Sequence, residues 1–200
     1  MPKRHQVKTY VPDSYYHVFN RGVNKRRIFT DSNDHAAFLG TFERYLSPTA
    51  QLDHRKRTYK SMHGKIELVS YCLMPNHFHL LLRQSADETA LTQLMRMTMP
   101  SYVDYFNRKH NRTGALFEGR YLASLVDSDR YLKNLVAYIH LNPAEPFGFP
   151  HSSHAHYMGK KQADWISSDR GVEIFEDRIH YLDYLMSVHD RDDLLVSISD

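Results

Sequence analysis

The order of segment types along this 200-residue chain predicts an α+β fold: a ferredoxin-like βαββαβ unit with an antiparallel sheet. Two observations carry this prediction. Short β-prone segments alternate with longer segments of helical periodicity, and one pair of strands is joined by only three residues, which suits an antiparallel pair. An added helix and a short tail follow the unit. We expect strands at 15–19, 66–73, 77–83 and 122–126, and helices at 32–45, 89–107, 128–142 and 178–188.

The first strand and the first helix have clear local signals. Residues 15–19 alternate between two faces and are rich in β-prone side chains. Asp31 or Ser32 can cap the helix that follows, because either side chain can accept from a free backbone N–H of the first turn. The stretch 47–64 is polar, basic and rich in turn-forming residues, so we expect a loop there. In the helix expected to begin near Ser32, the apolar side consists of Phe38, Leu39, Phe42 and Leu46.

A hairpin, a long helix and a last strand complete the unit. Residues 74–76 form a tight connection between the second and third strands. Pro100 lies inside the helix expected at 89–107 and should kink or divide it, because proline lacks the N–H of the helical ladder. Residues 122–126 supply the last strand. The inward side of the long helix consists of Leu91, Leu94, Met95 and Thr98.

Length and composition suit one domain with an extension. We expect the domain at 1–150 and an extension with an acidic tail at 151–200. No apolar run approaches the ~20 residues that span a bilayer, and the basic start is not followed by the hydrophobic stretch of a secretory signal. Cys72 is the only cysteine and cannot form an intramolecular disulfide, which fits a reducing cytoplasm.

The net charge of +3 conceals an asymmetry. Residues 173–200 hold eight acidic side chains and two arginines, a balance of −6, so the remainder carries +9. A basic body is what a binder of polyanions needs, because neutralising phosphates releases their counterions. A solvated basic surface is the alternative for any one cluster. The clusters are Arg21, Lys25, Arg26 and Arg27; Arg55, Lys56, Arg57, Lys60 and Lys65; and Arg108, Lys109, Arg112 and Arg120.

The spacing of His77 and His79 is typical of a pair of metal ligands. Successive side chains of a strand alternate between its faces, so both imidazoles share one face while Phe78 points into a core. Imidazole is the commonest metal ligand, and a strand holds two of them rigidly. The alternative is a pair of ordinary, half-exposed strand residues.

A second pair of functional residues ends the helix expected at 128–142. Tyr138 and Asn142 are four residues apart, so they share a helical face and can reach one site. Pro143 ends the helix close to them. The alternative is that Tyr138 is a core aromatic residue and Asn142 a helix cap. The apolar side of this helix consists of Leu132, Leu135, Val136 and Ile139.

These motifs together resemble the HUH single-tyrosine transposases of the IS200-like family, and most closely the REP-associated tyrosine transposases. The resemblance covers roughly residues 14 to 150 and keeps the family's order of blocks. The blocks are His17 to Gly22 with Arg27-Ile28-Phe29, Met74 to Leu82 around the histidine pair, Tyr105 to Lys109, Arg112 to Tyr121, and Tyr138 to Pro143.

The resemblance implies a metal-dependent endonuclease and strand transferase acting on single-stranded, hairpin DNA of repetitive palindromic elements. Tyr138 would be the nucleophile, giving a 5′-phosphotyrosine intermediate and a free 3′-OH. His77, His79 and the Asn142 side-chain oxygen would bind Mg²⁺ or Mn²⁺, which offsets charge on the phosphate. Some related transposases carry glutamine as the third ligand, and the REP-associated branch carries asparagine.

Residues expected to bind DNA come from the first strand with its following loop and from the end of the long helix. A hairpin exposes base edges and backbone that such side chains can reach. His140 faces away from Tyr138 and is left out of the site, while four further histidines show no ligand pattern and are expected at the surface. The DNA candidates are Asn20, Arg21, Lys25, Arg26, Arg27, Arg108, Arg112 and Arg120; the surface histidines are His110, His151, His154 and His156.

Two other functions stay open at this stage. One is a domesticated, catalytically silent protein that binds hairpin DNA or RNA for regulation. The other is a hydrolase of small phosphate esters built on the histidine pair, which would need no hairpin and form no covalent protein–DNA species. The residues also leave open whether the chain acts as a monomer or as a homodimer.

Overall fold

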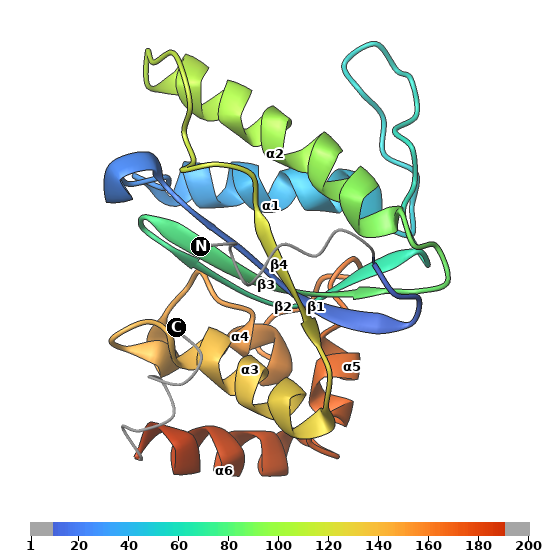
Figure 1. Ribbon diagram of the computed structural model, residues 1–200, viewed down its shortest axis with the longest axis vertical. Coiled ribbons are helices and arrows are strands. Elements are labelled where there is room, and N and C mark those ends of the chain that lie inside the picture. The colour runs from blue at the N-terminus through green and yellow to red at the C-terminus, as the bar shows by residue number, and fades with distance from the viewer. Residues whose placement is uncertain (1–9, 191–200) are drawn as a thin grey trace, which may run out of the picture.

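The computed structural model describes residues 10–190, and its element order confirms the expected βαββαβ unit (Figure 1). The strands are β1 (Ser14–Arg21), β2 (Ile66–Met74), β3 (His77–Gln84) and β4 (Leu122–Val126). The helices of the unit and of the segment after it are α1 (Ser32–Leu46), α2 (Ala90–Lys109), α3 (Asp129–Leu141), α4 (His154–Tyr157), α5 (Ser168–Glu173) and α6 (Arg178–His189), with 3₁₀ turns at Val23–Lys25 and Pro146–Gly148.

The strands form one antiparallel sheet in the order β2-β3-β1-β4. This is the strand order of a ferredoxin-like unit, so the expected fold class is confirmed. Strand β1 lies between β3 and β4, and its register places Arg21 opposite His77. Phe19 lies opposite His79 on one side and opposite Leu122 on the other. The end of β1 is therefore next to both the histidine pair and the start of β4.

Helices cover both faces of the sheet (Figure 1). On one face α1 and α2 enclose a core that includes Phe38 and Phe78. On the other face α3, α5 and α6 enclose a second core that includes Leu135 and Tyr181. Alternation along β3 sends Phe78 into the first core and Leu81 into the second. The sheet therefore separates two layers, and each strand contributes side chains to both.

Local signals set the helix boundaries. The Asp31 side chain accepts from the N–H of Asp34 and caps α1, as expected, and Ser128 caps α3 in the same way. Pro100 lies inside α2, which continues from residue 90 to 109 as one helix, so of the two expected effects, a kink or a division, the division does not occur. The apolar side of α2 is buried on both sides of Pro100, and that packing compensates for the missing backbone hydrogen bond.

The segment after residue 150 is more ordered than its composition indicates. It contains α4, and His154 and His156 are buried, which corrects their expected surface position. Backbone atoms of β2 explain this burial. The N–H of Leu73 donates to the carbonyl of His151 at 2.9 Å, and the N–H of Tyr71 to Oγ of Ser153 at 2.8 Å. An edge strand has backbone groups to satisfy, and this segment satisfies them.

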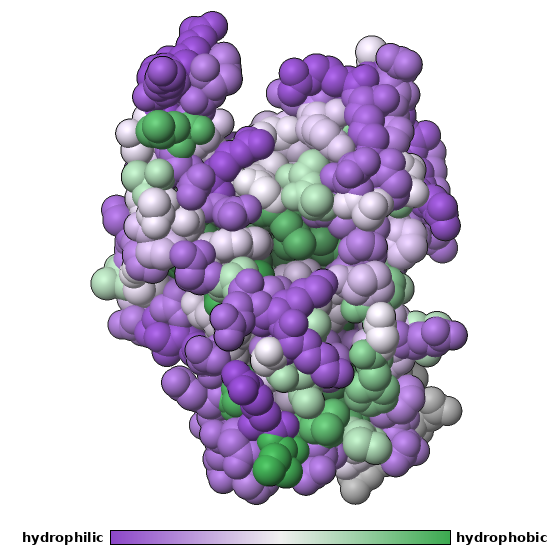
Figure 2. Space-filling model, turned by 180° about the vertical axis from the view of Figure 1, so that it is seen from behind, coloured by the Kyte–Doolittle hydropathy of each residue, from purple (hydrophilic) through white to green (hydrophobic). Residues whose placement is uncertain are grey.

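The surface differs between the two ends of the molecule. Seen from behind, the end formed by α1, α2 and their loops is mostly hydrophilic, whereas apolar side chains gather at the other end, where α6 lies (Figure 2). In the range 10–190 the structure contains no helix with the length and apolar character that a membrane span requires. The last part of the acidic tail, from residue 191, lies outside the described residues. The boundary at residue 150 between the expected domain and its C-terminal extension stays a prediction.

Candidate active site

His77 and His79 lie on the face of the sheet that α3 covers. They alternate along β3 with Phe78, which is fully buried in the core beneath α1 and α2. The centroids of the two imidazole rings are 5.0 Å apart and their planes cross at 83°. The expected sharing of one strand face therefore occurs, and the pair faces the helix that carries the other candidate residues.

The protonation of His77 is constrained by its two neighbours. Nδ1 of His77 lies 2.7 Å from Oδ1 of Asn76, and Nε2 lies 3.1 Å from Oδ1 of Asn142. The amide nitrogen of Asn76 donates to the carbonyl of Lys25 at 3.4 Å, which directs Oδ1 to the imidazole. Burial lowers the pKa of His77 and favours the neutral ring, which has one N–H. If Nδ1 donates to Asn76, then Nε2 presents a lone pair to a second oxygen.

His79 is held from the opposite side. Its Nδ1 lies 2.9 Å from Nε2 of His17, and the two rings are stacked with centroids 5.1 Å apart. Burial, followed by the neighbouring His17 and His77, lowers the pKa of His79 well below its ordinary value. His79 is therefore a neutral ring, and in the tautomer that donates from Nδ1 to His17 its Nε2 keeps the lone pair that a metal requires.

Helix α3 brings the tyrosine to the histidines within one chain. Its apolar side packs into the second core and turns Tyr138 toward β3, where its ring meets His79 edge-on at 5.2 Å and His17 at 6.2 Å. Tyr138 is 9% exposed. Burial raises the pKa of this phenol, while the Asn142 side chain and the charge of Arg21 act in the opposite direction. The phenol is protonated at neutral pH, so a reaction as a nucleophile would require further positive charge beside it.

The donor set fits a hard divalent cation with an incomplete protein shell. Two neutral imidazoles and an amide oxygen converge, and His77 Nε2 lies 3.1 Å from Asn142 Oδ1, so in the tautomer that donates from Nδ1 to Asn76 their lone pairs face each other. A cation satisfies both groups, whereas a neutral imidazole cannot donate to Asn76 and Asn142 together. Within residues 10–190 no group of three or more His, Cys, Asp or Glu side chains is arranged to hold a metal. The amide oxygen of Asn142 is the further donor that lies beside the histidine pair.

Comparison with known proteins assigns the family. The model of the IS200-like transposases matches residues 10–142, more than half of the chain, from just before β1 to Asn142. The chain belongs to this family. The matched range includes both histidines of β3, Tyr138 of α3 and Asn142, the residue that follows α3, so the residues of this candidate site all lie within the matched transposase range.

Two relatives of this IS200-like transposase are REP-associated tyrosine transposases, the branch that the sequence resembles. A protein of Haemophilus influenzae, provisionally named as one, is 28% identical over 109 residues, which are 48% of this chain and 61% of that protein. The match thus spans about three fifths of that relative's length. A solved REP-associated tyrosine transposase bound to a REP hairpin has a TM-score of 0.56 and 12% identity, covering 80% of this chain and 87% of that one. At this identity, the likeness shows the fold.

The basic residues of the transposase separate into different environments. Arg21 is exposed and its charge acts on His77, His79 and Tyr138, so it belongs to the same surroundings as the site. Asn20, the residue before it, points to the α2 side and donates to the carbonyl of Gly119 at 3.0 Å. Two DNA candidates adjacent in sequence therefore lie on opposite faces of the sheet.

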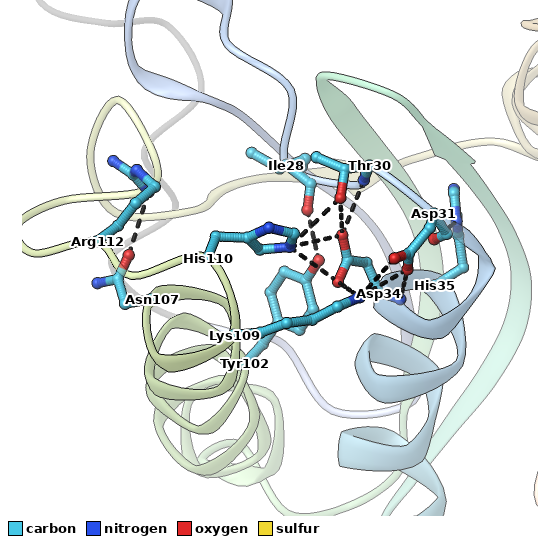
Figure 3. Close-up of polar contacts among 10 residues, drawn as sticks. All are labelled: Ile28, Thr30, Asp31, Asp34, His35, Tyr102, Asn107, Lys109, His110 and Arg112. Atoms are coloured by element: carbon cyan, nitrogen blue, oxygen red, sulfur yellow. Dashed lines mark hydrogen bonds and ion pairs between the residues drawn. The ribbon is translucent and has the colours of Figure 1, made fainter.

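The remaining DNA candidates of the transposase lie in loops and at the end of α2. Lys109, which belongs to the same basic cluster but is not a DNA candidate, pairs with Asp31 and Asp34, each at 2.7 Å, so its charge is largely neutralised (Figure 3). Arg112 donates to Asn107 at 3.1 Å and lies over the ring of Phe106. The others are solvent-exposed: Lys25, Arg26, Arg27, Arg108 and Arg120.

Two residues that contact the histidine pair are not among the site residues that the sequence predicts. His17 belongs to a family motif and Asn76 to the expected turn at 74–76. Alternation along β1 places His17 on the same face as Phe19, and the register carries that face to His79. Alternation along the first strand is therefore a sequence signal that could have identified His17. The contact of Asn76 with His77 depends on the loop at Lys25, which no sequence pattern specifies.

Proposed function

We propose that this IS200-like transposase cleaves and rejoins single-stranded hairpin DNA through a covalent 5′-phosphotyrosine intermediate on Tyr138. One observation carries the proposal: a phenol, two imidazoles and an amide converge on one face of the sheet. Asn142 lies 3.1 Å from His77, and the ring of Tyr138 lies 5.2 Å from that of His79. The family match supports DNA as the substrate class, because it places these groups in a transposase domain.

A divalent cation, Mg²⁺ or Mn²⁺, would be held by His77, His79 and Asn142. When bound, such an ion supplies positive charge that polarises a phosphate and stabilises negative charge on oxygen. The residues fit this role because both rings are neutral and the amide contributes a hard oxygen. Water and phosphate oxygens would complete the shell, as is usual for Mg²⁺.

Tyr138 would act as the nucleophile. Its Oη forms a bond to phosphorus in line with the departing 3′ oxygen, the phenolic proton is lost, and the 3′ oxygen leaves as a 3′-OH. The phosphotyrosine retains the energy of the broken phosphodiester, so a DNA hydroxyl can later attack it and rejoin strands without a nucleotide cofactor. Burial raises the pKa of this phenol, so the positive charge around it has to stabilise the phenolate.

Hairpin DNA fits the charge of the chain. The body outside residues 173–200 carries +9, and exposed basic residues lie next to the site and in the loop that follows β1. The solved relative bound to a REP hairpin supports a palindromic hairpin as the partner of this chain as well.

The proposal is tested by detecting a covalent protein–DNA adduct. Labelled hairpin DNA with single-stranded flanks, incubated with the chain and Mn²⁺, should yield a protein–DNA species that survives denaturation. Tyr138→Phe and chelation by EDTA should each abolish it, and Tyr138→Phe should leave DNA binding within a few-fold. Tyr59→Phe, which removes a hydroxyl from a loop, is the matched control and should retain the adduct. An adduct undiminished in Tyr138→Phe would reject the nucleophile.

The silent DNA-binding alternative gives a different result in the same assay. A chain that only binds DNA for regulation would bind the hairpin with Mn²⁺ or without it and form no adduct under any condition. A phosphate-ester hydrolase would release inorganic phosphate from small substrates and show no preference for the hairpin. The convergence of Tyr138 with the histidine pair favours the strand transferase over both.

A further inference from the structure

The loop between β1 and α1, residues 22–31, is hydrogen-bonded to the turn that precedes the histidine pair. The N–H of Ile28 donates to the carbonyl of Pro75 at 2.8 Å, and the N–H of Gly22 donates to the carbonyl of Asn76 at 2.8 Å. Ile28 is fully buried in the core beneath α1 and α2. Because Asn76 directly precedes β3, a shift of this loop is transmitted to the start of that strand.

Helices α1 and α2 hold the other side of the same loop (Figure 3). The hydroxyl of Tyr102 on α2 donates to the carbonyl of Ile28. Two residues further on, the N–H and Oγ of Thr30 donate to the Asp34 carboxylate of α1 at 2.8 and 2.7 Å. The side chains of Tyr102 and Asp34 are fully buried. Ile28 is therefore fixed from two sides, by the turn through its N–H and by α2 through its carbonyl.

The middle of the loop has a backbone shape that needs support from outside. Asn24 and Lys25 have φ angles of 54° and 57°, in the left-handed region that residues other than glycine rarely adopt. A Cβ at Gly22 would lie 2.2 Å from the carbonyl oxygen of Arg26, so the loop folds back closely on itself. The carbonyl of Lys25 accepts from the side-chain amide of Asn76 at 3.4 Å. The place of this acceptor therefore depends on the contacts that anchor the loop.

Asn76 links the position of that carbonyl to the orientation of His77. Its amide nitrogen donates to Lys25, so its Oδ1 faces Nδ1 of His77 at 2.7 Å. Within residues 10–190 the Lys25 carbonyl is the one acceptor of this amide nitrogen. A displaced loop would free the amide to turn, and an NH₂ group beside Nδ1 favours the tautomer that carries its proton on Nε2. In that tautomer the His77 ring donates to Asn142 and has no lone pair for a cation.

We propose that Tyr102 is a positioning residue for the candidate metal site. Its hydroxyl fixes the loop between β1 and α1, the loop fixes Asn76, and Asn76 fixes His77. The effect reaches through the sheet, because Tyr102 lies in the core on the α2 side whereas the histidine pair lies on the side that α3 covers. The inference rests on the proposed function for the metal, but the His77 tautomer that it explains exists without metal.

The first test reads that tautomer in the metal-free chain by ¹⁵N nuclear magnetic resonance of the imidazole nitrogens, with His77→Gln identifying the signals. Tyr102→Phe keeps the ring packed on Phe38, 5.0 Å away, and removes only the hydroxyl. It should shift the His77 tautomer ratio about fivefold toward Nε2–H, the change that one net hydrogen bond brings. Tyr16→Phe is the matched control: its buried hydroxyl bonds to the backbone of Val11, at the opposite end of β1, and its loss should leave the ratio unchanged.

The second test measures Mn²⁺ affinity in two backgrounds. Tyr102→Phe should weaken Mn²⁺ binding about threefold in the wild-type chain, less than direct loss of an orienting partner does. In the Asn76→Ala background the same substitution should change the affinity by less than about 1.5-fold, because residues that act through one another are not additive. Thermal unfolding verifies that each variant folds.

Two results would overturn the positioning role of Tyr102. One is a His77 tautomer ratio that Tyr102→Phe leaves as in wild type. The other is an equal loss of Mn²⁺ affinity with and without Asn76, which would mean a general effect of a weakened core. A wild-type chain that binds no Mn²⁺ would reject the proposed metal site, and the tautomer ratio would then decide the role of Tyr102 on its own.

Discussion

Asn76 provides a sharp test of the proposed metal site, because it contacts a ligand without being one. We predict that Asn76→Ala weakens Mn²⁺ binding at least about tenfold, since loss of a group that orients a metal-binding histidine typically costs about 10- to 100-fold. The wild-type Oδ1 accepts from His77 Nδ1 at 2.7 Å and so keeps the lone pair on Nε2. Without Asn76, the metal-free ring gains by donating from Nε2 to Asn142.

The magnitude follows from that competing hydrogen bond. A net hydrogen bond contributes about 0.5–1.5 kcal/mol, so stabilising the wrong tautomer accounts for up to about tenfold in affinity. Free rotation of the His77 ring adds to the loss, which places the expected effect in the lower part of the range for such residues. In the Asn76→Ala protein, a hydrogen bond from Nε2 to Oδ1 of Asn142, atoms that lie 3.1 Å apart in the structure, is the one that a bound cation would have to displace.

The assay is titration of the purified chain with Mn²⁺, following the electron paramagnetic resonance signal of the free ion. Asn76→Asp is the matched control: it keeps an oxygen acceptor for His77 but loses the amide donor to Lys25, so it should bind Mn²⁺ at least as tightly as wild type. Thermal unfolding verifies that both variants fold. An Asn76→Ala affinity within about twofold of wild type would refute the orienting role, and so would an Asn76→Asp protein as weak as Asn76→Ala.

Two further predictions concern stability. Asp34, whose side chain is fully buried, accepts from Thr30 and pairs with Lys109 (Figure 3). Burial raises its pKa, but these hydrogen bonds outweigh burial and the net pKa is lowered. Its stabilising effect is therefore present above the ordinary carboxyl pKa of about 4 and is lost as pH falls. Asp34→Asn should lower the free energy of unfolding at pH 7 by about 2–4 kcal/mol and reduce its loss toward pH 3 in urea titrations; equal pH profiles would contradict this. Phe78→Ala, which removes a ring packed on Phe38 at 5.1 Å, should cost about 3–5 kcal/mol in the same urea assay, and a loss below about 1 kcal/mol would contradict its core position.

Local patterns in the chain specify most of its elements. Helical periodicity and a capping residue located α1 and α3, and the three-residue connection before His77 located the β2–β3 hairpin. These features depend on residues only a few positions apart. The period of each backbone type and the capping side chains therefore predict them from the sequence. The pairing of His77 with His79 and of Tyr138 with Asn142 belongs to the same class, because each pair shares a face of one element.

Long-range packing decided which of those faces meet. Nothing local places α3 over the same side of the sheet as His79 rather than over the α1–α2 side; the second core, built with help from α5 and α6, does so. Long-range contacts also buried His154, whose neighbours in the sequence are typical of a loop. The segment that contains α4 pairs with free backbone groups of edge strand β2, and this places His154 in the interior. Periodicity describes one element at a time and carries no information about its partners.

Tertiary structure also separated residues that the sequence groups together. Asn20 and Arg21 are adjacent DNA candidates in the sequence, yet strand alternation sends one to the α2 side and the other to the histidine pair. Lys109, in another basic cluster, is neutralised by two aspartates contributed by the α1 region. The chain alone thus specified the chemistry available and the face of each element that carries it. Only folding decided which groups meet, because contacts between distant segments depend on how whole elements pack.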